Sequence, residues 1–210
     1  MYLEFLLVKP ISSFSHPLKY ICQMDAINKA NLISELQNKV LEIKNEVHEL
    51  TSMKEELLST KPSEKVWSVL QIIEHLNITH SFYFGQFESK IEKGQRDEKD
   101  YYKPSWVGNM SEKTMRPDSK GKINYAVRTF RSLRPDVNVQ YDTIEKFLSD
   151  QDRFLKILDK SSDLDFGKNR VKTVLGNFLT LKYGDALRFV TAHAERHIKQ
   201  IQNTLDALAE

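Results

Sequence analysis

The sequence of 210 residues contains a single cysteine and no long apolar run. Cys22 cannot form a disulfide within the chain, so nothing points to an oxidising compartment, and we expect a cytoplasmic protein. The apolar residues 1–8 include Glu4, lack a preceding basic region and end at Lys9, which makes them too short for a signal peptide or a membrane span. We therefore expect no association with a membrane.

Strong charge of one sign is also missing, because the formal net charge is only +2. Binding to nucleic acid usually requires a domain-wide excess of lysine and arginine, so we expect no nucleic-acid partner. The glycine-rich motifs of nucleotide-binding proteins, the GxSxG motif of serine hydrolases and the CxxC motif of redox proteins are absent as well. The common nucleotide, serine-hydrolase and redox functions therefore have no support.

Apolar residues recur at intervals of three or four along four segments, which is the pattern of amphipathic helices. Ser68 and Gln71 form a capping-box pattern before the second segment. The two stretches between the later segments contain glycine or proline and show no sustained alternation that would indicate a sheet. The sequence thus predicts an all-α four-helix bundle with long connections between helices two and three and between helices three and four. The predicted helices cover residues 27–58, 69–93, 136–160 and 180–209.

Helical periodicity begins only after Met24, and a chain of this length is long enough for one substantial core. We assign residues 25–210 to a single bundle domain and residues 1–24 to an N-terminal extension outside it. Two interpretations of residues 1–23 stay open. They form either a loose segment of the native protein or an upstream reading of a gene whose natural start is Met24.

The histidines are the residues that most directly indicate chemistry. His193 and His197 are four residues apart and therefore lie one turn apart on the same face of the fourth helix, at the edge of its apolar stripe. His75 lies on the apolar face of the second helix. Three neutral imidazoles from two facing helices would hold a metal ion on one side and leave positions open for water, as in catalytic sites. The alternative is that all three are hydrogen-bonded core residues.

Two segments resemble the signature segments of the DinB-like superfamily, which also includes the YfiT-type metal-dependent hydrolases. They are WSVLQIIEHL at residues 67–76 and HAERHIKQI at residues 193–201, and the resemblance covers residues 25–208. It implies a four-helix bundle, often a homodimer, that binds one divalent transition metal. Zinc or nickel is expected first, with iron or manganese as further candidates. The ligands implied are His75, His193 and His197.

The resemblance also implies a small-molecule substrate. Several members of the superfamily resemble S-transferases that use a low-molecular-weight thiol such as bacillithiol, mycothiol or glutathione. We therefore expect a metal-dependent hydrolase or a thiol-dependent S-transferase in which the ion activates water or a thiol. Two alternatives stay open: a non-catalytic metal- or ligand-binding stress-response protein, and a structural bundle whose histidines only pack. The sequence identifies no general base.

The remaining histidines are expected to have structural roles. His80 follows His75 by five residues, about 140° round the helix, and should miss a metal held by His75. A surface or interhelix position is expected for it. His16 and His48 fall outside the two signature segments and are also expected to be structural.

Several other polar or aromatic residues lie close to the predicted ligands. Glu74 and Gln200 could orient an imidazole, but we favour solvent exposure for both. Glu195 is expected to point outward, about 200° round the helix from His193. Trp67 is expected to anchor the start of the second helix by packing.

Residues 103–134 carry eight basic side chains against two acidic ones. A thiol cofactor bearing carboxylates would suit such a surface, with aromatic residues at the mouth of a pocket. A solvated loop is the alternative that we favour. The aromatic residues concerned are Tyr101, Tyr102 and Trp106.

Overall fold

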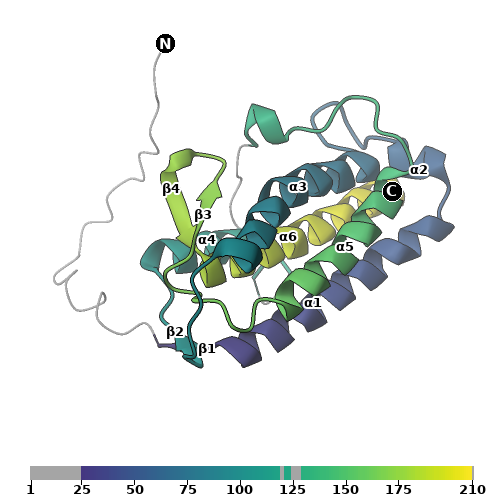
Figure 1. Ribbon diagram of the computed structural model, residues 1–210. Coiled ribbons are helices and arrows are strands. Elements are labelled where there is room, and N and C mark those ends of the chain that lie inside the picture. The colour runs from purple at the N-terminus through teal and green to yellow at the C-terminus, as the bar shows by residue number, and fades with distance from the viewer. Residues whose placement is uncertain (1–24, 119–120, 124–128, 210) are drawn as a thin grey trace, which may run out of the picture.

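The computed structural model describes residues 25–118, 121–123 and 129–209. It confirms a mainly helical fold, a four-helix bundle with long connections before its third and fourth long helices. The predicted N-terminal extension, with His16 and Cys22, lies outside the described residues. Among the helices of the described part of the chain, none is long and apolar enough to cross a membrane. Figure 1 shows the four long helices side by side: α1 (Lys29–Glu49), α3 (Val69–Lys93), α5 (Thr143–Asp159) and α6 (Tyr183–Ala209).

The order of the helices around the bundle differs from their order in the chain. α1 packs against α5 and α6, and α3 packs against the same two helices. α1 and α3 therefore lie on one diagonal of the bundle, while α5 and α6 lie on the other. In a simple up-and-down bundle, successive helices are neighbours. Here the chain crosses the end of the bundle between α1 and α3 and crosses again between α5 and α6.

Local side-chain hydrogen bonds explain where the helices start. The predicted capping box of α3 is present, because Ser68 Oγ accepts from the N–H of Gln71 and Gln71 Oε1 accepts from the N–H of Ser68. At the start of α1, Asn28 Oδ1 accepts from the N–H of Asn31 at 2.9 Å. Each bond satisfies an N–H group that has no partner within the helix itself.

The first predicted helix is too long. α1 stops at Glu49, and the 3-10 turn η2 (Leu50–Ser52) and the short helix α2 (Glu55–Ser59) follow. The hydroxyls of Thr51 and Ser52 donate to the carbonyls of the last turn of α1, which ends the helix there. The change of direction buries Leu58 and leaves Leu57 39% exposed, so the apolar stripe of α1 does not continue to Leu57 as a single helix over residues 27–58 would require.

The third predicted helix also begins later than expected. α5 starts at Thr143, whereas the sequence pattern predicts a start near Asp136. The carbonyls of Asp136 and Val137 accept hydrogen bonds from the side-chain amide of Gln71, at 3.0 and 3.4 Å. This tertiary contact with α3 holds the segment before α5 outside the helix.

A two-stranded hairpin lies between α5 and α6, where the sequence predicts only irregular structure. β3 (Arg170–Thr173) pairs antiparallel with β4 (Gly176–Lys182), and Val171 lies opposite Leu181. Gly176 has φ of 66° at the turn, a conformation that glycine adopts without strain. Because β4 continues to Lys182, α6 begins at Tyr183 instead of near residue 180.

The connection between α3 and α5 contains a short strand, which pairs with the segment just before α1, and a helix that covers α6. Asp185 on α6 is fully buried and accepts from the N–H (2.9 Å) and the hydroxyl (2.6 Å) of Ser105. Gly108 permits this close approach, because a Cβ there would lie 2.2 Å from Cγ of Asp185. The elements are β2 (Tyr101–Tyr102), which pairs with β1 (Ile27–Asn28), and α4 (Trp106–Met115).

The core consists of two clusters of buried apolar side chains that follow one another along the bundle. Tyr83 and Val190 belong to one cluster, and Leu76 and Ala194 belong to the other. The clusters therefore meet near the middle of α3 and α6. His80 lies at this level, 1% exposed, with its ring stacked on Phe84 at 4.7 Å between centroids.

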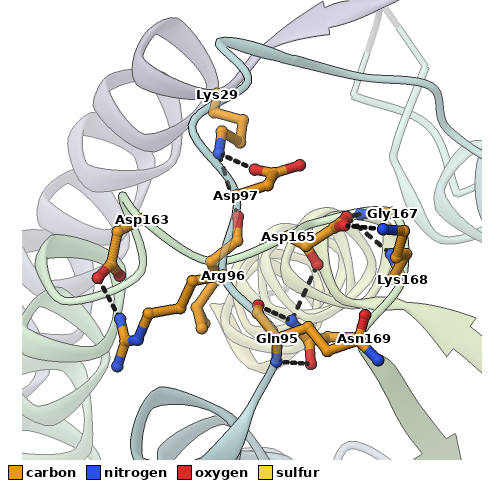
Figure 2. A network of polar contacts seen from close by, with 10 residues as sticks. Lys29, Gln95, Arg96, Asp97, Asp163, Asp165, Gly167, Lys168 and Asn169 are labelled. Atoms are coloured by element: carbon orange, nitrogen blue, oxygen red, sulfur yellow. Dashed lines mark hydrogen bonds and ion pairs between the residues drawn. The ribbon is translucent and has the colours of Figure 1, made fainter.

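Polar side chains fasten the two long connections to each other and to the start of α1 (Figure 2). Lys29 Nζ donates to Asp97 Oδ1 at 2.7 Å. The side-chain amide of Asn169 donates to the carbonyls of Gln95 (2.7 Å) and Asp165 (3.0 Å), and its Oδ1 accepts from the N–H of Gln95 (2.9 Å). We call these five residues the loop network. It holds the chain in place just before the hairpin and α6.

Candidate metal centre

α3 and α6 face each other and bring the three predicted ligands together. His75, His193 and His197 are 2%, 9% and 7% exposed. Nε2 of His193 lies 3.3 Å from Nε2 of His75 and 3.1 Å from Nε2 of His197. One ring nitrogen from each of the three lies within 4.8 Å of those of the other two. We call these residues the histidine cluster.

The second ring nitrogen of two of these histidines bonds to an acceptor. His75 Nδ1 donates to the carbonyl oxygen of Leu133 at 2.7 Å, in the 3-10 turn η3 (Arg131–Leu133). His197 Nδ1 donates to Oε1 of Gln200 at 2.8 Å. Because a neutral imidazole carries one proton, Nε2 of His75 and Nε2 of His197 each carry a lone pair that faces the cluster.

His193 cannot form a hydrogen bond to both neighbours. Its Nε2 carries at most one proton, and its Nδ1 is buried without a hydrogen-bond partner among the described residues. A metal ion could accept a lone pair from all three rings. With metal–nitrogen distances of 2.0–2.1 Å, a tetrahedral zinc ion separates its ligand nitrogens by about 3.3 Å. The observed separations of 3.1 and 3.3 Å fit this geometry, so the side chains present suit a divalent ion.

Burial keeps the histidine cluster uncharged at neutral pH. Desolvation lowers the pKa of His75 and, together with the neighbouring histidines, holds the pKa of His193 well below its ordinary value. Desolvation and the proximity of His75 lower the pKa of His197 to about 3. The neutral imidazole is the form that binds a metal ion. The three imidazoles are therefore already in the neutral form at pH 7 and can bind a cation without first releasing a proton.

A cavity of about 460 Å³ opens beside the histidine cluster, and all three histidines line it. Further lining comes from α3 and α6, from residues 65–67, and from Val174 at the turn of the hairpin. The connection between α3 and α5 contributes Met115, Ile123, Thr129, Phe130 and Leu133. Most of these side chains are apolar, and Lys65 and Arg196 add positive charge. Within the described part of the chain, no aspartate or glutamate lines the cavity. Its volume and lining are typical of a site for a small molecule.

Comparison with known proteins supports the fold. Residues 44–201, which include all three histidines, match the DinB superfamily. The chain belongs to the DinB superfamily. YfiT from Bacillus subtilis shares the DinB bundle with a TM-score of 0.51 and 16% sequence identity, over 96% of this chain and 93% of that chain. YfiT is described as a probable metal-dependent hydrolase with an unusual four-helix bundle topology. No curated protein matches the chain significantly.

Two residues beside the histidines of this DinB bundle lie differently from the prediction. Gln200 does not simply face solvent, because it accepts the Nδ1–H of His197. Glu195 does not point freely outward either. It is partly buried, and its carboxylate pairs with Lys39 of α1 at 2.6 Å and lies 3.6 Å from Arg116. The expectation for Glu195 fails because it treats α6 as an isolated helix, whereas α1 and the end of α4 cover its Glu195 face. The contact between Gln200 and His197 lies within α6 itself.

Four other residues singled out in the sequence lie outside the histidine cluster. Glu74 accepts from the hydroxyl of Thr143 at 2.6 Å and from the side-chain amide of Asn77. His80 faces α5, with its Nδ1 3.4 Å from Nε2 of Gln151. Trp67 lies at the start of α3, and its ring centroid is 5.3 Å from that of His75. His48 is exposed on α1.

The aromatic residues considered for the mouth of the pocket do not line the cavity. Tyr101 and Trp106 are 57% and 64% exposed, and Tyr102 is buried against Phe166. Among the described residues, the positive charge of the cavity comes from Lys65 and Arg196, and no described basic side chain of residues 103–134 lines it. Arg196 could have been noticed in the sequence, because it lies between the two histidines of α6. Nothing in the local sequence pattern indicates Lys65.

Proposed function

We propose that His75, His193 and His197 bind one divalent transition metal ion through Nε2, and that the protein is a metal-dependent enzyme acting on a small molecule in the adjoining cavity. The observation that carries the proposal is the convergence of buried imidazole lone pairs beside a mainly apolar cavity. Zinc, nickel and iron suit imidazole ligands, and manganese, which prefers oxygen ligands, is the last candidate. When bound, such an ion lowers the pKa of a coordinated water or thiol and so supplies a nucleophile near neutral pH.

The side chains of this chain would orient the site and select the substrate. Leu133 and Gln200 hold two of the imidazoles with Nε2 toward the cluster. The apolar lining would exclude water and favour an apolar substrate body. Arg196 and Lys65 line the same cavity and would favour a substrate group with negative charge.

Hydrolysis is the first reaction that we propose. YfiT, which shares the fold, is described as a probable metal-dependent hydrolase. Thiol transfer is the second candidate, and one observation favours it. No carboxylate of the described residues lines the cavity, so a general base for water is missing there. A thiol needs less assistance, because its ordinary pKa is only about 8.5. A low-molecular-weight thiol bearing carboxylates would also suit Arg196 and Lys65.

The metal part of this proposal is tested by elemental analysis of protein purified without an affinity tag or chelator. Wild type should carry about one zinc, nickel, iron or manganese ion per chain. The double variant His193→Ala, His197→Ala should carry none, whereas the control His80→Gln should match wild type because His80 lies outside the cluster. Absence of metal from wild type, even after incubation with these ions, would mean that the histidines only pack.

The reaction is tested by turnover assays on the metal-loaded wild type and the double variant. Hydrolysis of 4-nitrophenyl esters that depends on the metal would support the hydrolase. Conjugation of 1-chloro-2,4-dinitrobenzene to glutathione or bacillithiol would support the S-transferase. A protein that binds metal but turns over neither class would correspond to the non-catalytic binding protein. Sedimentation analysis of the same samples tests the expected homodimer.

A further inference from the structure

The cavity extends from the histidine cluster along α3 and α6. On α3, His75 and Tyr83 both line it and are two helical turns apart, which corresponds to ~12 Å along the axis. On α6, Phe189 lies one turn before His193, and the two rings stack at 6.0 Å between centroids. Tyr83 lies 5.9 Å from Phe189 across the gap between the helices. An aromatic wall therefore leads from the histidines to Tyr83.

The side chain of Tyr83 is only 2% exposed, and no described residue bonds to its hydroxyl. The hydroxyl is not one of the fully buried unpaired atoms, so it keeps some accessible surface, and Tyr83 lines the cavity. Two other buried tyrosines differ in this respect. The hydroxyl of Tyr183 lies 2.7 Å from the hydroxyl of Ser161, and that of Tyr102 lies 3.4 Å from Asp185. The hydroxyl of Tyr83 is therefore available to bond to water or to a ligand group in the cavity.

The hydroxyl of Tyr83 acts as a donor in this environment. Burial raises the pKa of Tyr83 above its ordinary value, and no neighbouring group contributes to the change. The phenol therefore stays protonated throughout the physiological pH range. It can donate one hydrogen bond to an acceptor that enters the cavity.

The hairpin lies over the part of α3 that carries Tyr83. Gln86, three residues further along α3, accepts from the N–H of Lys172 at 2.9 Å and donates to its carbonyl at 3.2 Å. Val174, at the turn that follows, lines the cavity. The position of the hairpin relative to α3 is thus held by specific hydrogen bonds, and the turn limits how far a ligand can extend past Tyr83.

We propose that the hydroxyl of Tyr83 is a second anchoring point for the substrate, which is an elongated, mainly apolar molecule with its reacting group at one end and a carbonyl oxygen ~12 Å away. This inference rests on the proposed function, because it places the reacting group at the histidine cluster. The apolar body would lie against Phe189, Leu133 and Phe130, all of which line the cavity.

The test uses linear alkanehydroxamic acids of increasing length, each in a plain form and in a form with a terminal methyl ketone. The hydroxamate chelates zinc, and the ketone supplies the acceptor. Dissociation constants are measured by calorimetry on zinc-loaded and on metal-free wild type, Tyr83→Phe and Tyr183→Phe. Tyr83→Phe removes one oxygen atom that has no protein partner, so this variant should fold as wild type does.

At one chain length, wild type should bind the ketone about threefold to tenfold more tightly than the plain acid, the worth of one hydrogen bond. Tyr83→Phe should lose this preference and bind the plain acid as wild type does. Tyr183→Phe, altered in the core, should keep the preference.

Three results would overturn the inference. Wild type could bind the plain and the ketone-bearing acids equally at every length, or Tyr83→Phe could keep the preference for the ketone. The third is that no probe binds to the zinc-loaded or the metal-free protein. A protein that fails to bind zinc but keeps the preference in its metal-free form would overturn the proposed function and leave the assignment of Tyr83 standing.

Discussion

Two polar regions of this bundle differ in how completely their hydrogen bonds are satisfied. In the loop network, Lys29 Nζ donates to Asp97 and also to the carbonyl of Leu164, and the amide of Asn169 uses its oxygen and its nitrogen (Figure 2). In the histidine cluster, Nδ1 of His193 has no described partner, and the Nε2 atoms of the cluster approach only one another.

This difference is the one expected if the loop network fixes the fold and the histidine cluster binds the proposed metal ion. A satisfied polar network in a protein interior specifies how the chain packs. Polar atoms left without partners destabilise the folded protein unless something else binds them. We therefore expect substitutions in the loop network to lower stability and leave metal binding unchanged. Substitutions around the histidine cluster should weaken metal binding and change stability little.

The largest effect on stability is expected for Asn169→Leu. The change removes three hydrogen bonds and leaves the N–H of Gln95 without its acceptor, while the carbonyls of Gln95 and Asp165 keep their backbone donors. We expect the free energy of unfolding to fall by about 3 kcal/mol, measured by urea denaturation. Lys168→Ala is the matched control, because Lys168 is exposed and its ion pair with Asp165 is worth at most about 0.5 kcal/mol. If Asn169→Leu stays folded but loses metal binding, the claim that the loop network affects only stability is contradicted.

A smaller effect is expected from the pH dependence of the metal-free protein. Burial lowers the pKa of His80 to about 3, so the unfolded chain binds a proton at His80 near pH 6.5 and the folded chain does not. The stabilisation from neutral His80 is complete above that pH and declines as the pH falls toward 3. Between pH 7 and pH 5, the free energy of unfolding should therefore fall by about 2 kcal/mol less in His80→Gln than in wild type.

The loop network should contribute little to acid sensitivity in that range. Despite some desolvation, the N–H groups of Lys168 and Gly167 hold the pKa of Asp165 below its ordinary value, so its contribution declines only at lower pH. Urea denaturation at half-unit pH steps compares wild type with His80→Gln. Identical slopes between pH 7 and pH 5 would show that the acid sensitivity arises elsewhere.

The smallest effect is expected for Gln200→Ala. Without Gln200, Nδ1 of His197 loses its acceptor, and the ring is less well oriented. We expect zinc affinity to fall about tenfold, while the free energy of unfolding without metal changes little. Glu74→Ala is the control, because Glu74 bonds to Thr143 and Asn77 and to no histidine. Competition with a chromophoric chelator measures both affinities, and equal affinities for the two variants would contradict the role of Gln200.

Features that depend on a few neighbouring residues could be predicted from the sequence. The capping box of Ser68 and Gln71 acts within a single turn, and it places the start of α3 correctly. The spacing of His193 and His197 puts both rings on one face of any helix. That His75 meets them depends on how two helices pack, and here the prediction relied on the resemblance to the DinB-like superfamily.

Features that depend on distant parts of the chain could not be predicted. The diagonal arrangement of α1 and α3 leaves no periodic signal in either helix. The strands of the hairpin are short, and Val171 finds its partner Leu181 only across a turn. The position of Glu195 is decided by Lys39 on another helix. The cavity is likewise formed by separate segments, which is why Tyr83 has no distinguishing pattern in the sequence.

The central claim is that the histidine cluster exists to bind a metal ion through three imidazoles. X-ray absorption spectroscopy of protein loaded with one equivalent of zinc tests this most directly. We predict three imidazole nitrogens at about 2.0–2.1 Å in wild type and in Asn169→Leu, and loss of this signature in the His193→Ala, His197→Ala variant. Zinc bound mainly through oxygen or sulfur, or the same spectrum from the double variant, would contradict the claim.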